Sequence, residues 1–105
     1  MTPAQATVSV DDDRVRVTTW DFDAAASTGA HRHEFDYIVV PVTGGVFRVI
    51  GQDGAESERT QVAGVPYAGT AGTEHDVVNA TDSRLTFVEI ELKRSPSSGS
   101  TSDSP

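Results

Sequence analysis

The sequence predicts an all-β domain, a barrel or a sandwich, from three observations. Apolar and polar residues alternate with a period of two in "RVRVTTWDF" at 14–22 and "RLTFVEIEL" at 84–92. β-branched residues dominate these runs, and such side chains pack better on a pleated sheet than in a helix. No stretch of ten or more residues has helical periodicity with capping residues, and "DAAAST" at 23–28 is too short to hold a helix alone.

Turn signals separate the strands at nearly even spacing. "TGG" at 43–45 is expected to form a tight hairpin between "DYIVVPV" and "GVFRVI", because glycine tolerates positive φ. "GQDG" at 51–54 and "NATDS" at 79–83 are the other turn signals. Many short strands joined in this way are typical of a barrel or a sandwich.

The chain has 105 residues, which is enough for one compact core. The last eleven, "SPSSGSTSDSP", carry one charge and no large apolar side chain, so burial cannot offset their ordering entropy. We therefore expect one ordered domain over residues 5–94 and a disordered tail over 95–105.

Composition narrows the classes of partner. With 8 basic and 16 acidic side chains the formal net charge is −8, which disfavours nucleic acid and anionic membrane surfaces. Cysteine is absent, so disulfides, thiolate metal sites and a thiol nucleophile are excluded. The N-terminal residues have no basic segment followed by an apolar one, as a secretory signal would. We expect a cytoplasmic protein.

Two of the three histidines, His31 and His33, stand one residue apart in a strand-like segment. Side chains at i and i+2 of a strand project from one face, so the two imidazoles can chelate one cation. Alone, this pair is a weak signal that fits ordinary surface histidines better than a metal site. The third histidine, His75, lies in "GTEHDVVN" some forty residues later.

Together, "GAHRHEFDYIVVPVTG" and "GTEHDVVN" resemble the paired signature of the cupin superfamily. The resemblance covers roughly residues 8–93 and extends to small single-domain cupins, some of them assigned to β-alanine degradation. It implies a jelly-roll β-barrel in which the three histidines converge on one divalent metal ion. The residues that match the two motifs in register are His31, His33, Gly44, Gly72, His75 and Asn79.

The sequence departs from this pattern at Tyr37, where the family usually has a glutamate ligand. Alternation places the nearby carboxylates, Glu34 and Asp36, on faces opposite His33 and Tyr37 respectively. A neutral phenol in place of a carboxylate leaves the site with a net charge of about +2, which favours an anionic ligand. Tyr37 is a weak ligand, a proton donor to bound substrate, or an aromatic wall residue. Imidazole ligands do not choose among Zn, Fe, Mn, Ni and Cu.

Four further residues lie near the motifs. Thr70 stands where the second motif usually has proline, so the turn there is expected to be looser. Tyr67 is a candidate rim residue or an edge-strand packing residue, and Arg48 pairs a substrate carboxylate only if it faces inward. Asn79 is expected to stabilise a turn through its side chain.

Two functions fit this sequence. The first is a small metalloenzyme of dioxygenase, lyase or isomerase type, with Tyr37 as its catalytic residue, acting on a small carboxylate or amino-acid catabolite related to β-alanine. The second is a non-catalytic carrier of a small anionic molecule. A homodimer is expected, because exposed edge strands pair readily and cupins share this habit.

Overall fold

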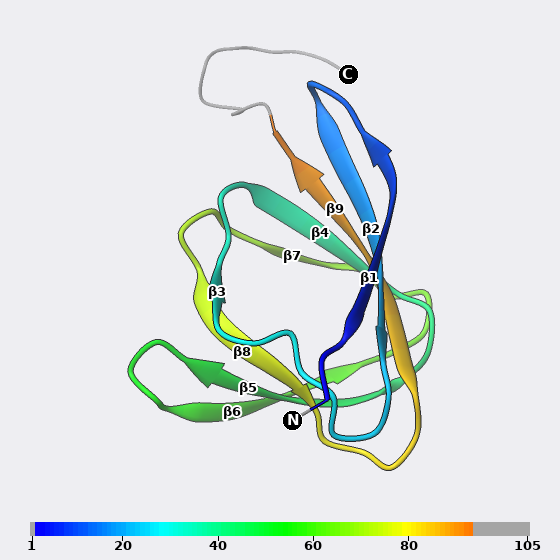
Figure 1. Cartoon of the computed structure of the whole chain (residues 1–105), viewed down its shortest axis with the longest axis vertical. Helices are drawn as coiled ribbons and strands as arrows, with labels where there is room; N and C mark the ends of the chain where they lie inside the picture. The colour runs from blue at the N-terminus through cyan, green and yellow to red at the C-terminus, as the bar shows by residue number, and fades with distance from the viewer. Residues whose placement is uncertain (1, 94–105) are drawn as a thin grey trace.

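A computed structural model describes residues 2–93 of the chain (Figure 1). Within this range the chain forms strands and no helix, and no segment is a helix able to cross a membrane. The tail predicted at 95–105 lies outside the described residues. The strands are β1 (Gln5–Asp11), β2 (Val15–Phe22), β3 (His31–Arg32), β4 (Asp36–Pro41), β5 (Gly45–Gly51), β6 (Glu56–Gln61), β7 (Tyr67–Gly69), β8 (Glu74–Asn79) and β9 (Leu85–Leu92).

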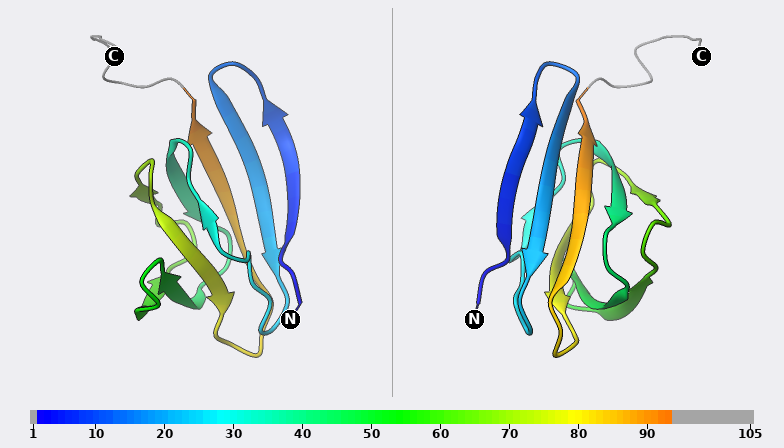
Figure 2. Two further views of the ribbon diagram at one scale, coloured as in Figure 1. Left: turned by 60° about the vertical axis from the view of Figure 1, so that its left-hand side comes forward. Right: turned by 90° about the vertical axis from the view of Figure 1, so that its right-hand side faces the viewer.

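The strands form two facing antiparallel sheets (Figure 2). One has the order β1-β2-β9-β4-β7 and the other the order β3-β8-β5-β6. The chain crosses repeatedly between the sheets, and this arrangement confirms the predicted all-β jelly-roll fold. Strand pairing within the described residues leaves the two sheets separate, so the molecule is a sandwich rather than a barrel closed by hydrogen bonds.

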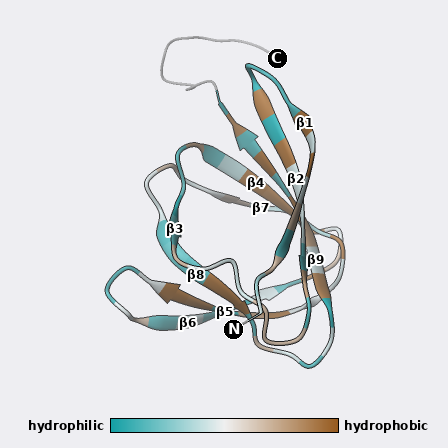
Figure 3. Ribbon diagram, viewed as in Figure 1, coloured by the Kyte–Doolittle hydropathy of each residue, from teal (hydrophilic) through white to brown (hydrophobic). Residues whose placement is uncertain are grey.

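Aromatic side chains from both sheets form the core. The ring of Phe22 on β2 lies 4.8 Å from that of Phe47 on β5 and 5.5 Å from that of Phe87 on β9. Each residue is at most 6% exposed, and Phe47 also contacts Phe87 edge-on. Figure 3 shows that much of β5, which carries Phe47, is hydrophobic, whereas the neighbouring strand β6 is largely hydrophilic. Phe47 and Phe87 also line the pocket described below, so the core forms one of its walls.

The predicted hairpin at "TGG" is wrong. β4 and β5, on either side of it, belong to different sheets, so the segment is a crossover. Gly45 is needed there because a Cβ atom would overlap the side chain of Leu85. The local signal for a turn was sound, but turn residues do not reveal whether the flanking strands pair with one another.

The other two turns form where the sequence indicates. In "GQDG" the N–H of Gly54 donates to the carbonyl of Gly51 at 2.9 Å, and the turn joins the paired strands β5 and β6. At the second turn, the amide nitrogen of Asn79 donates to the carbonyls of Phe22 and Ser83, at 3.2 and 2.7 Å. Asn79 therefore stabilises a turn, as predicted.

Candidate metal centre

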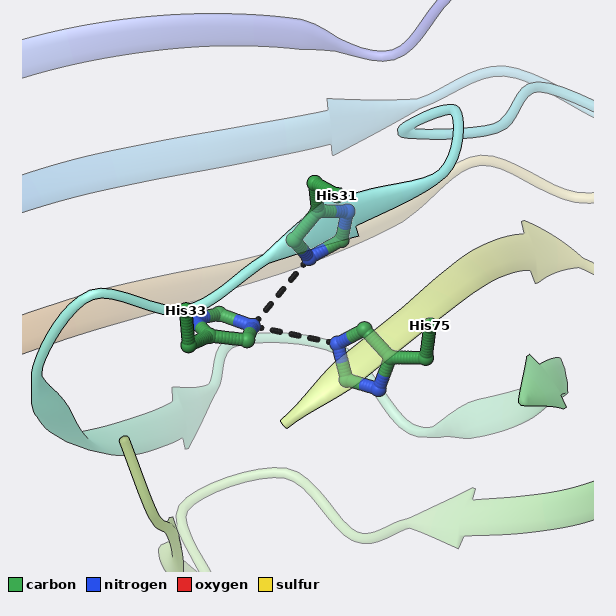
Figure 4. A group of neighbouring side chains, drawn as sticks. All are labelled: His31, His33 and His75. Carbon is green, nitrogen blue, oxygen red and sulfur yellow. Dashed lines mark hydrogen bonds between the residues drawn. The ribbon is translucent and has the colours of Figure 1, made fainter. Parts of the chain in front are cut away.

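The structure brings together the three histidines that the sequence singled out (Figure 4). His31 on β3 is the cross-strand partner of His75 on β8, so their side chains lie on the same face. The Nε2 atom of His33 lies 3.1 Å from that of His31 and 3.0 Å from that of His75. One ligand atom from each residue falls within 4.8 Å of the other two.

Backbone hydrogen bonds to the turn before β8 hold His33 just beyond the end of β3. Its N–H donates to the carbonyl of Thr73, and its carbonyl accepts from the N–H of Gly72, both at 2.8 Å. Gly72 adopts a φ of 91°, a conformation that disfavours residues with a Cβ atom. The two sequence motifs are thereby joined through the backbone as well as through the histidine rings.

The hydrogen bonds of His31 define its tautomer. Its Nδ1 atom lies 2.9 Å from the carbonyl oxygen of Gly29, which can only accept. Nδ1 of neutral His31 therefore carries the proton, and Nε2 presents a lone pair to the cluster.

Burial, followed by the repulsion that a protonated His31 would exert, lowers the pKa of His33 and His75 to about 4. Both rings are therefore neutral at pH 7, as metal ligands must be. The Nε2 atom of His33 has either one proton or one lone pair, so it forms a linear hydrogen bond to at most one of its two neighbours. Nitrogens bound about 2.1 Å from one ion lie about 3.0–3.4 Å apart, and the two Nε2–Nε2 distances from His33 fit ligands of one divalent cation.

Tyr37 packs against the cluster through the face of its ring. The ring stacks on His33 with 3.9 Å between centroids and 18° between planes. It lies over Gly69, its cross-strand partner, where a Cβ atom would overlap the phenol. Burial, then the charge of Glu89, raises the pKa of Tyr37, so the phenol is neutral at pH 7. Its role as proton donor remains a prediction.

The carboxylates near the first motif lie away from the cluster, as alternation suggested. Glu34 is exposed, and an oxygen of Asp36 accepts a hydrogen bond from the N–H of Ala71 at 2.8 Å. Arg48 is also exposed and faces Glu56 at 3.5 Å.

Sequence reasoning missed the two buried carboxylates among those that line the pocket, Glu89 and Glu91 on β9. They are 8% and 9% exposed. Arg16 donates two hydrogen bonds to Glu91, at 2.6 and 2.8 Å. Glu89 accepts a bond from the indole N–H of Trp20 at 3.2 Å. The sequence contained a signal for them. The period-two pattern puts both carboxylates on the face of β9 that also carries Leu85 and Phe87, which are buried.

Glu89 also faces the histidine cluster. Its Oε2 atom lies 3.8 Å from Nδ1 of His33, the ring nitrogen that points away from the other histidines. The pKa of Glu89 is raised, mainly because the carboxylate is buried. An acidic group in this place favours the tautomer of His33 that keeps its proton on Nδ1.

The cluster lines a pocket of about 800 Å³ between the two sheets. Tyr67 of β7 also lines it, and the guanidinium of Arg59 on β6 lies 4.2 Å from the centre of that ring. The pocket thus combines three imidazoles, a buried acidic wall and a cation at the opposite sheet.

Two antiparallel sheets in jelly-roll order around a pocket lined by HxH and a third histidine define a cupin. The chain belongs to the cupin superfamily. Over 90 residues it is 44% identical to the β-alanine degradation protein BauB of Pseudomonas aeruginosa, covering 86% of this chain and 94% of that protein. No family model matches the sequence.

Solved structures agree with this assignment. A cupin domain from Bordetella pertussis superposes with a TM-score of 0.85 at 41% identity, covering 89% of this chain and 96% of that one. A protein with a double-stranded β-helix domain from Klebsiella pneumoniae gives a TM-score of 0.71 at 15% identity, covering 87% and 77%. The second similarity concerns the fold alone.

Proposed function

We propose that this protein is a small metal-dependent cupin enzyme that acts on a small carboxylate or amino-acid catabolite. The observation that carries the proposal is the convergence of the Nε2 atoms of His31, His33 and His75 at a pocket wall. The relative named for β-alanine degradation supports a substrate related to β-alanine.

The three neutral imidazoles would hold a divalent ion without cancelling its charge, so an anionic substrate is attracted to the site. When bound, the ion supplies a Lewis acid that polarises a substrate oxygen or acidifies bound water. Imidazole ligands suit Zn, Fe, Mn, Ni and Cu alike.

The chain's own groups contribute orientation and protons. His31 is oriented by Gly29, and His33 lies between the ring of Tyr37 and the carboxylate of Glu89. The neutral phenol of Tyr37 carries a proton at neutral pH, which makes it the candidate donor to a substrate bound beside His33. The core side chains that line the pocket exclude water from one wall.

Metal analysis of untagged protein tests the proposal. We expect about one equivalent of a divalent metal in the wild type, and a loss of most of it in His75→Ala and His33→Ala. Arg48→Ala, an exposed change on β5, is the control and should retain the metal. Equal metal content in His75→Ala and the wild type would exclude the three-histidine site.

A non-catalytic carrier is the second candidate, favoured by the size and partly apolar lining of the pocket. A thermal-shift screen of small carboxylates, with and without a chelator, separates the two. Stabilisation by a ligand that survives metal removal, without turnover in the metal-loaded protein, would favour the carrier.

A further inference from the structure

Arg59 lies on the inner face of the smaller sheet. It is the cross-strand partner of Phe47, which is 1% exposed and belongs to the core. Residues directly opposite one another on paired strands project from the same face, so Arg59 is directed toward the pocket that it lines. Arg59 is itself exposed at this pocket, whereas Arg48, the residue after Phe47 on β5, lies 3.5 Å from Glu56 on the outer face.

Among the described residues, Arg59 lacks the carboxylate partner that the other arginines lining the pocket have. Arg16 donates two hydrogen bonds to Glu91, and Arg32 lies 3.8 Å from Glu74. For Arg59, the residues of the range 2–93 provide no carboxylate within ion-pair distance. An arginine that lines a pocket in a strongly acidic protein without such a partner is available to a ligand.

Tyr67 orients this guanidinium. The central carbon of the guanidinium lies 4.2 Å from the ring centre of Tyr67, a cation–π contact that links edge strand β6 to edge strand β7 of the other sheet. The contact is made at the central carbon, and within residues 2–93 the N–H edges of Arg59 take part in no hydrogen bond or ion pair. Those edges match a carboxylate, which accepts two parallel hydrogen bonds.

The charge balance of the pocket selects a ligand with a single negative charge. The unpaired guanidinium of Arg59 neutralises one carboxylate. The other charges disfavour a dianion, because Glu34, Glu58 and Glu89 also line the pocket, Glu91 is already paired with Arg16, and the net charge is −8. We infer that Arg59, held by Tyr67, forms a subsite that binds the carboxylate group of a small monocarboxylate. The inference rests on the proposed function, because this ligand is taken to be the substrate of the proposed enzyme. The subsite itself contains none of the three histidines.

Titration of the full-length, metal-free protein tests the subsite, with propionate, neutral propionamide and inorganic phosphate as probes. We expect propionate to bind at least tenfold more tightly than the other two. Arg59→Met should weaken propionate binding at least tenfold, and Arg59→Gln should behave alike. Arg48→Met, on the outer face of the neighbouring strand, should leave the affinity unchanged. Circular dichroism confirms that each variant is folded.

The inference is overturned if folded Arg59→Met or Arg59→Gln binds propionate as tightly as the wild type, or if phosphate or propionamide binds as well as propionate. If both variants fail to fold, Tyr67→Leu decides, because it keeps the guanidinium and removes its support: unchanged affinity would refute the subsite. Binding that requires metal and is insensitive to Arg59 would refute the subsite and leave the proposed function intact. Arg59-dependent binding, together with metal analysis that finds no bound metal in the untreated wild-type protein, would support the subsite and refute the proposed function.

Discussion

The ring of Tyr37 stacks on the imidazole of His33, with 3.9 Å between the ring centres and the planes only 18° apart. The residue that replaces the usual acidic ligand of the family therefore supports a histidine of the cluster from the side. Tyr37 therefore has two possible contributions that can be tested separately: its ring supports His33, and its hydroxyl carries a proton.

Tyr37→Phe keeps the ring and removes the hydroxyl. We expect metal affinity to change less than about threefold, because the stacking on His33 is preserved, while turnover falls about 10²-fold or more if the phenol is a general acid. Steady-state kinetics and metal titration of the same preparation measure the two effects. Arg48→Ala, on the outer face of β5, is the control and should keep its turnover. Equal turnover in Tyr37→Phe and the wild type would remove Tyr37 from the chemistry.

Glu89→Gln removes a negative charge 3.8 Å from Nδ1 of His33. We expect metal affinity to fall about 10- to 100-fold, because carboxylates behind a histidine ligand make it more basic and orient it. Competition with a chelator of known affinity measures the change. The exposed Glu56→Gln should bind metal as the wild type does. An unaltered affinity in Glu89→Gln would mean that the carboxylate does not support His33.

The metal-free protein should lose stability in mild acid. His33 and His75 titrate near pH 4 in the fold, against 6.5 for the ordinary value. The unfolded chain therefore binds more protons between pH 6.5 and 4, and the free energy of unfolding decreases as pH falls through this window. Glu89, whose pKa is raised, acts in the opposite direction and reduces the net loss.

Urea unfolding in the presence of a chelator at pH 7 and pH 5 measures this loss, which we expect to be on the order of 2 kcal/mol. His75→Asn should show a smaller decrease, because it removes one of the two groups. Stability that is constant or that rises toward pH 5 would contradict the burial of neutral histidines.

Gly69→Ala should displace Tyr37. A Cβ atom at this position overlaps the phenol ring, whose cross-strand partner is Gly69. We expect a destabilisation of about 1–3 kcal/mol, together with weaker metal binding because the support of His33 is lost. Gly44→Ala is the control, since the nearest atom to its Cβ would be an ordinary 3.5 Å away. If thermal unfolding shows both variants equally stable, the close packing of Tyr37 on β7 is not rigid.

The class of fold and the histidines could be predicted from sequence because both depend on local patterns. Period-two alternation determines which residues share a face, and it placed His31 and His33 together. The same rule put Glu89 and Glu91 on the buried face of β9, but an acidic pair there reads as solvated until the opposite sheet is known. Local turn chemistry likewise indicated a bend at "TGG" without showing that it crosses between sheets.

The sequence by itself determined the alternating strands, most of the turns and the pairing of two histidine motifs. Only the tertiary structure decided which strands became partners. That choice set Arg59 opposite Phe47, brought Glu89 to His33 and laid Tyr37 over Gly69. The physical reason is that strand pairing joins residues far apart in the chain, and its energy depends on the packing of both faces, which no local window contains.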